Sequence, residues 1–207
     1  MIIKKFMEKN ILAVYGSPRT GSNTSTLMAS FIAGVEENPA GGSLKVHRLR
    51  INSLDISPCR GCRSCSLTGQ CVIQDDMQKV YGLLEKADFI AVASPIFFTS
   101  VPAGLKALID RCQKYWSLKY ELRQKVVESQ RQGIFLSCAG SGSGKIFDCA
   151  RKVIRSFFDV LDINYHSDYV YLKVDEKGDI NKHPHALKQV YDWGRSEQFY
   201  NLLKVGE

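Results

Sequence analysis

The chain has 207 residues, of which 44% are hydrophobic and 24% are charged, as expected for one globular domain, 1–207, with a buried core. The charged residues 1–10 are not typical of a signal peptide, and the longest apolar run, FIAVASPIFF, is interrupted by Ser94 and Pro95, so we expect a cytoplasmic protein without a membrane span. The formal charge of +7 comes from scattered Lys and Arg residues, apart from a run between Lys114 and Arg131, and indicates a solvated surface rather than nucleic-acid binding.

Strand-like and helix-like segments alternate along the chain, which predicts an α/β fold with helices on both faces of a parallel sheet. Apolar runs without polar alternation are typical of central strands, which are covered on both sides. Segments of mixed polarity are typical of edge strands. The predicted strands are 11–15, 89–94 and 134–139 at the centre, and 44–51 and 169–174 at the edges.

Apolar residues at helical spacing predict a helix between each pair of successive strands, and a last helix near 187–203. With the first, third and fourth strands at the centre, right-handed crossovers lead to a doubly wound, three-layer sheet of five strands in the order 2-1-3-4-5. Such sheets bind ligands beyond the carboxyl ends of their strands, where the first and third strands part. The loops after Tyr15, Ser94 and Cys138 are therefore the candidate site.

The first of these loops, Gly16 to Thr24, has the composition of a phosphate-binding loop. Glycines let the backbone approach a phosphate, hydroxyl and amide groups donate to it, and Arg19 adds positive charge at the start of a helix. A triphosphate is not expected, because Ser22 and Asn23 stand where a Walker motif needs Lys and Ser or Thr. The alternative is a capped helix start built from turn residues.

Two further loops follow the third and fourth predicted strands. Phe97 and Phe98 are placed to pack against a planar ligand, although an isolated aromatic pair is also typical of a core. The glycine-rich segment 139–144 offers bare backbone to the edge of a flat ring, although flexibility alone would explain the same glycines. Three such loops at one end of a sheet predict one ligand pocket.

The segments GSPRTGSNT and SPIFFTSVPAGLKALIDR closely resemble the NAD(P)H-dependent FMN reductase group of the flavodoxin-like superfamily, and the similar pattern extends over nearly the whole chain. The resemblance implies a flavodoxin-like fold, bound FMN and oxidoreductase activity, with structural roles for Asp110 and Arg111. It assigns the phosphate to Ser17, Arg19, Ser22, Asn23 and Thr24, the lining of the ring to Pro95, Ile96, Phe97 and Phe98, and its flank to Ala139, Gly140 and Ser141.

A CxxCxxCxxxxxC motif lies in the expected loop 53–75, after the second strand, and comprises Cys59, Cys62, Cys65 and Cys71. In a reducing cytosol such close spacing indicates metal binding or catalysis rather than disulfides, and four thiolates are the ligand set of a 4Fe–4S cluster. The motif resembles that of the iron–sulfur flavoproteins, a branch of the same family, which implies this cluster beside FMN. A four-cysteine zinc site or an empty thiol loop is the alternative. The other three cysteines are expected to pack in the core: Cys112, Cys138 and Cys149.

FMN accepts electrons singly or as hydride, whereas a cluster passes one at a time, so no side chain is expected to act as catalytic acid or base. The resemblance implies electron entry from NAD(P)H or reduced ferredoxin, a small-molecule acceptor, and a homodimer or homotetramer. The basic run 114–131 would suit an acidic ferredoxin, and an open ring face beside Phe98 would suit NAD(P)H. The alternatives are an NAD(P)H-dependent FMN or quinone reductase without a cluster, and a zinc-stabilised flavodoxin-like module without enzymatic activity.

Overall fold

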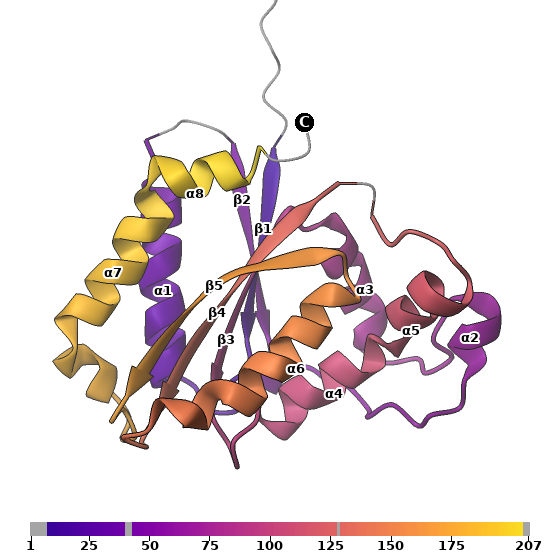
Figure 1. The fold of residues 1–207 in the computed structure, drawn as a ribbon, viewed down its shortest axis with the longest axis horizontal. Coiled ribbons are helices and arrows are strands. Elements are labelled where there is room, and N and C mark those ends of the chain that lie inside the picture. The colour runs from indigo at the N-terminus through magenta and orange to yellow at the C-terminus, as the bar shows by residue number, and fades with distance from the viewer. Residues whose placement is uncertain (1–7, 40–42, 128, 205–207) are drawn as a thin grey trace, which may run out of the picture.

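The computed structural model describes residues 8–39, 43–127 and 129–204, which contain a five-stranded sheet between two layers of helices (Figure 1). Every neighbouring pair of strands is parallel, and the order β2-β1-β3-β4-β5 confirms the prediction. The strands are β1 (Lys9–Tyr15), β2 (Leu44–Arg50), β3 (Phe89–Pro95), β4 (Arg131–Ala139) and β5 (Ile163–Leu172).

Two apolar clusters, one on each face of the sheet, form the core. One face is covered by α1 (Asn23–Glu36), α7 (Pro184–Arg195) and α8 (Glu197–Leu202), and the other by α3 (Met77–Lys86), α4 (Ala103–Arg111) and α6 (Asp148–Asp159) (Figure 1). Successive side chains of a strand point to opposite faces, so Ile11 joins the first cluster and Leu12 the second. Both faces of the central strands are buried, as the lack of polar alternation in their sequences predicted.

Two predicted boundaries are wrong. Strand β5 begins at Ile163 instead of residue 169, because exposed polar residues such as Asn164 and His166 conceal the start of this edge strand. The expected last helix is two helices. Ser196 has extended backbone angles (φ −73°, ψ 151°), and its hydroxyl accepts a hydrogen bond from the Phe199 N–H, so it ends α7 and caps α8.

The segment that carries the cysteine motif lies at the side of the molecule away from α1 and α7 (Figure 1). It contains the short helix α2 (Ser64–Thr68), which packs against α5 (Gln113–Trp116) and the π-helical turn Ser117–Glu121. Short 3₁₀ turns occur at Ile51–Ser53, Gly144–Phe147 and Asp179–Lys182. In the part of the chain that the structure describes, no helix has the length and apolar character needed to cross a membrane.

Candidate functional site

The loops after β1, β3 and β4 meet at the carboxyl edge of the sheet. Strand pairing places Tyr15 beside Ala93 and Pro95 beside Cys138, so the chain leaves the three central strands at neighbouring points. A cavity of about 100 Å³ lies between these loops and the segment that follows β5. We call it the loop cavity.

The loop cavity brings together most of the residues that the sequence assigned to FMN. Those that line it are Ser17, Arg19, Ser22, Asn23, Thr24, Pro95, Ile96, Phe97, Ala139 and Gly140. Phe98 and Ser141 are not among the lining residues. The grouping supports one ligand pocket, and the contact of each residue with FMN stays a prediction.

The loop between β1 and α1 forms the polar end of the loop cavity. At Gly16 a Cβ atom would lie 2.5 Å from Leu105 Cδ2, so any other residue at that position would force the buried Leu105 side chain of α4 to shift. Ser22 caps α1 by accepting a hydrogen bond from the Ser25 N–H, and Thr24 is buried in the first turn. The first N–H groups of a helix have no partner within it, so hydroxyls and N–H groups here fit an anionic group such as a phosphate.

The loop after β3 ends in a tight turn that exposes Phe98. Phe97 and Ser100 exchange backbone hydrogen bonds of 2.9 and 3.0 Å, and the two residues between them, Phe98 and Thr99, have φ of 47° and 65°. Positive φ at both central positions is the geometry of a type I′ turn and is unfavourable for bulky or β-branched residues. Phe97 is 40% exposed and Phe98 fully exposed, so the alternative that both are core aromatics is wrong.

The side chain of Asn23 is bonded to the segment that follows β5. Its Nδ2 donates to the Glu176 carbonyl oxygen at 2.8 Å, and its Oδ1 accepts from the N–H groups of Gly178 and Ile180 at 2.9 and 3.3 Å. Asn23 therefore fastens segment 176–180 to the phosphate-binding loop. A direct contact with the phosphate would fall to its backbone N–H at the start of α1.

Replacing Asn23 with alanine is expected to weaken FMN binding by about tenfold. Each lost hydrogen bond to buried backbone removes about 1 kcal/mol of the free energy that keeps segment 176–180 in place beside the loop cavity. Quenching of FMN fluorescence measures the affinity. Asn38→Ala is the matched control, since Asn38 also anchors backbone, donating at 3.0 Å to the carbonyls of Gly194 and Ser196, away from the loop cavity. Equal FMN affinities in the two variants would contradict the assignment.

Sequence reasoning missed four residues of the loop cavity. Cys138 ends β4, and Val174, Asp175 and Lys177 come from the segment after β5. Lys177 reaches the phosphate-binding loop, where its Nζ lies 3.6 Å from the point that a Cβ on Gly21 would occupy. The predicted strand order could have indicated the residues after β5, because an edge strand next to β4 must end beside the loop that follows β4.

Lys177→Gln is expected to weaken FMN binding roughly three- to tenfold, since an exposed ammonium group contributes about 1 kcal/mol to holding an anion. Lys173→Gln removes the same charge from the same segment, but Lys173 does not line the loop cavity. The comparison uses the same fluorescence titration at low ionic strength. A loss of affinity that is equal in both variants would show a general effect of charge instead of a contact by Lys177.

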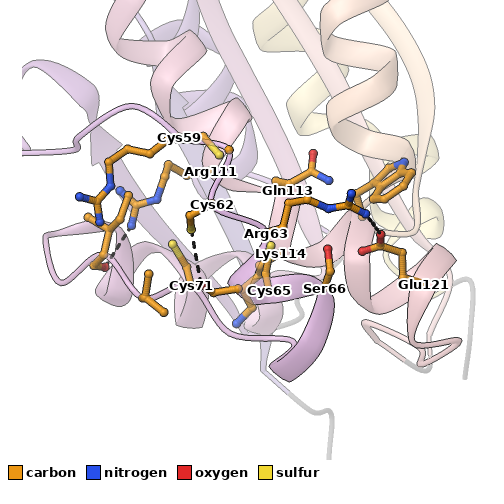
Figure 2. Close-up of a pocket in the computed structure, with 16 residues that line it drawn as sticks. Cys59, Cys62, Arg63, Cys65, Ser66, Cys71, Arg111, Gln113, Lys114 and Glu121 are labelled. Atoms are coloured by element: carbon orange, nitrogen blue, oxygen red, sulfur yellow. Dashed lines mark hydrogen bonds and ion pairs between the residues drawn. The ribbon is translucent and has the colours of Figure 1, made fainter.

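The four motif cysteines line a second cavity, of about 340 Å³, which we call the cysteine cavity (Figure 2). Cys59 and Cys62 precede α2, Cys65 lies within it, and Cys71 follows it. Among the described residues, the two cavities have no lining residue in common. The chain therefore has two separate candidate binding sites.

The chemistry of the cysteine cavity suits an iron–sulfur centre. All seven cysteines are free thiols, and the backbone N–H and hydroxyl of Ser64 lower the pKa of the Cys62 thiol. Within residues 8–39, 43–127 and 129–204, no three His, Cys, Asp or Glu side chains are close enough together to hold a metal ion, so the sulfurs surround the cavity without forming a closed ligand set. Four cationic side chains also line it, namely Arg60, Arg63, Arg111 and Lys114. Three of them already pair with a carboxylate: Arg63 with Glu121, Arg111 with Asp75 and Lys114 with Glu85.

The three cysteines outside the motif differ in burial. Cys112 and Cys138 are buried, as predicted, and burial raises the pKa of the Cys138 thiol to about 12 and that of Cys112 still further. Both thiols are therefore protonated and inert near neutral pH. The prediction for Cys149 is wrong, because this residue lies on the exposed side of the first turn of α6.

The basic run between Lys114 and Arg131 does not form one exposed patch. Lys114 is buried over the ring of Tyr81 and pairs with Glu85 at 3.3 Å, and Arg131 is only 2% exposed. Lys119 pairs with Asp162 at 2.9 Å. Lys114 and Arg131 therefore cannot contribute to an exposed docking surface, and ferredoxin docking on the rest of the run stays a prediction.

The sequence model of the NADPH-dependent FMN reductase family matches residues 9–173. The chain is 31% identical over 154 residues to an iron–sulfur flavoprotein of Methanosarcina thermophila, a match that covers 74% of this chain and 73% of that protein. It is 33% identical over 104 residues to an iron–sulfur flavoprotein of Archaeoglobus fulgidus, covering 50% of this chain and 46% of that one. An azoreductase from Bacillus anthracis shares the fold, with a TM-score of 0.68 at 14% identity, covering 90% of this chain and 99% of that chain. The chain therefore belongs to the NADPH-dependent FMN reductase family of oxidoreductases, in the branch whose members are named iron–sulfur flavoproteins.

Proposed function

We propose that this protein binds FMN in the loop cavity and a 4Fe–4S cluster in the cysteine cavity. Through them it passes electrons between NAD(P)H or reduced ferredoxin and a small-molecule acceptor. The observation that carries the proposal is that all four motif cysteines line one cavity, which in the described part of the chain shares no lining residue with the loop cavity. The names of the matched relatives support the same assignment.

The loop cavity would hold FMN through its polar end. Ser17, Ser22 and Thr24 would donate to the phosphate together with the first N–H groups of α1, while Arg19 and Lys177 would balance its charge. When bound, FMN supplies a carrier that exchanges electrons singly or as hydride. The chain's own contribution is to bind and orient it and to control the access of solvent.

The cysteine cavity would hold the cluster through its four thiolates, and the cluster supplies transfer of one electron at a time. Iron is favoured over zinc because zinc sites of four cysteines usually consist of two separated pairs, whereas three of these cysteines follow one another at two-residue gaps. Free thiols suit a reducing compartment, so we place the protein in the cytoplasm.

Exposed arginines beside the cysteines, Arg60 and Arg63, are cationic groups that would meet an acidic ferredoxin. The exposed Phe98 would lie beside the ring face that NAD(P)H approaches. Because the two cavities are built from different residues, a homodimer or homotetramer would let one chain's cluster serve another chain's flavin.

Anaerobic purification followed by quantification of flavin, iron, zinc and acid-labile sulfide per chain tests both cofactors. One FMN with about four iron and four sulfide would support the proposal. Stoichiometric zinc without iron would overturn the cluster, and protein that stays colourless after reconstitution with FMN would overturn the flavin site.

The electron donor is tested with the same preparation. Steady-state oxidation of NADPH by the FMN-loaded protein would support a turnover enzyme, and iron-free protein with undiminished activity would support the reductase without a cluster. Reduction by ferredoxin alone would support an electron carrier that serves protein partners.

A further inference from the structure

The guanidinium of Arg111, at the end of α4, is buried between the two ends of the cysteine segment. Its side chain is 0% exposed, and its Nη1 and Nη2 pair with the two carboxylate oxygens of Asp75 at 2.5 and 3.1 Å. Nη1 also donates to the Ser57 carbonyl oxygen at 2.9 Å, and Nη2 to that of Ile73 at 3.2 Å. A planar, rigid donor group is suited to such a fourfold contact, and lysine could not reproduce it.

Ser57 and Ile73 stand on either side of the cysteine motif, which runs from Cys59 to Cys71. Arg111 therefore ties both ends of the segment to one point. Asp75 strengthens the same junction, since its Oδ2 accepts a hydrogen bond from the Ser57 N–H at 3.0 Å. The distance between the two ends of the segment, and with it the span available to the four sulfurs, depends on this pair.

One donor of Arg111 is left over. Its Nε–H is buried and finds no acceptor among the described residues, although an unpaired buried donor costs about 1–3 kcal/mol. Arg111 lines the cysteine cavity, on the side that Cys59, Cys62 and Cys71 occupy in Figure 2. Burial acts to lower the pKa of Arg111, but the nearby Asp75 and Cys71 side chains raise it above its usual value. The unpaired donor therefore lies in the wall of the cysteine cavity.

We infer that Arg111 is the positioning residue of the cluster site: its Nη groups hold the two ends of the cysteine segment at the correct spacing, and its unpaired Nε–H is available to donate to a sulfur of the site. The inference rests on the proposed cluster. A hydrogen bond to a ligand sulfur stabilises the added negative charge of a reduced cluster, so Arg111 raises the reduction potential. Without a cluster, Arg111 still restrains the segment.

Arg111→Lys keeps the positive charge but removes the paired Nη donors and the Nε–H. It therefore separates the effect of these hydrogen bonds from the effect of the charge alone. Arg151→Lys is the matched control, because Arg151 also pairs with a carboxylate through two nitrogens, contacting Asp168 at 3.0 and 2.7 Å on α6 and β5. The first readout is the midpoint potential of the cluster, measured by EPR-monitored reductive titration. The potential is expected to become more negative in Arg111→Lys and to stay unchanged in Arg151→Lys.

The second readout is tryptic cleavage at Arg60 and Arg63 in the full chain after removal of metal. Loss of the charge-assisted hydrogen bonds is expected to speed cleavage roughly tenfold or more in Arg111→Lys but not in Arg151→Lys. If Arg111→Lys does not fold, Asp75→Asn weakens the same pair with little change in shape and is measured in the same two ways.

The results distinguish this inference from the proposed function. Wild-type protein without iron would refute the cluster, and the cleavage rates would still test the restraint. Iron-loaded variants with wild-type potential and wild-type cleavage would overturn the role of Arg111 and leave the cluster intact.

Discussion

Cys62→Ser is expected to leave the purified protein with almost no iron or sulfide and with its full content of FMN. Cys62 is exposed in the cysteine cavity, and its lowered pKa favours the thiolate that metals bind. A serine hydroxyl is a harder ligand and stays protonated near neutral pH, so it cannot replace a thiolate on iron. The loop cavity contains no residue of the motif, which is why flavin should stay.

The measurement is iron, sulfide and flavin per chain, with the visible spectrum as a check. Cys149→Ser is the matched control, because Cys149 is an exposed thiol outside the motif and should lose nothing. Iron at the wild-type level in Cys62→Ser would exclude this residue as a ligand. Loss of flavin together with iron would show that the two sites are coupled through folding.

Most of the fold could be predicted because the central strands carry an unambiguous signal. Segments 11–15, 89–94 and 134–139 are buried and almost entirely apolar, with Ser94 and Ser137 as the exceptions, and this pattern places them at the centre. Edge strand β5 gave a weaker signal, since polar residues are allowed on its wet side. The break at Ser196 depends on one cap, and a hydroxyl residue between two apolar patterns does not reveal it.

The candidate site was predictable where strand order determined it and unpredictable where long-range hydrogen bonds did. Ser17 and Thr24 follow directly from the loop after β1. The hydrogen bonds between Asn23 and segment 176–180 join positions far apart in the sequence, so no local sequence pattern predicts them. The same holds for Arg111, which the sequence marked only as structural, while its contacts with Ser57 and Ile73 exist only in the folded chain.

Arg131→Met is expected to destabilise the protein by at least about 3 kcal/mol, since it leaves buried carbonyl groups without donors at about 1–3 kcal/mol each. Arg131 is the first residue of β4, and burial lowers its pKa. Its Nη1 donates to the carbonyls of Leu84 and Ala87, at 2.6 and 3.1 Å, and its Nη2 to that of Leu161. One cation thus satisfies the ends of both α3 and α6, where a positive charge also interacts favourably with the helix dipoles.

Urea denaturation of the cofactor-free protein measures this loss, because bound cofactors would add their own stabilisation to the folded state. In thermal unfolding a chain of this size should lose about 2–4 °C for each kcal/mol. Arg48→Met is the control, since Arg48 is a half-exposed partner of Glu36 and should contribute less than about 1 kcal/mol. Equal losses in the two variants would mean that water reaches the freed carbonyls of α3 and α6. Arg131 lines neither cavity, so FMN affinity measured well below the unfolding temperature should stay at the wild-type value in both variants.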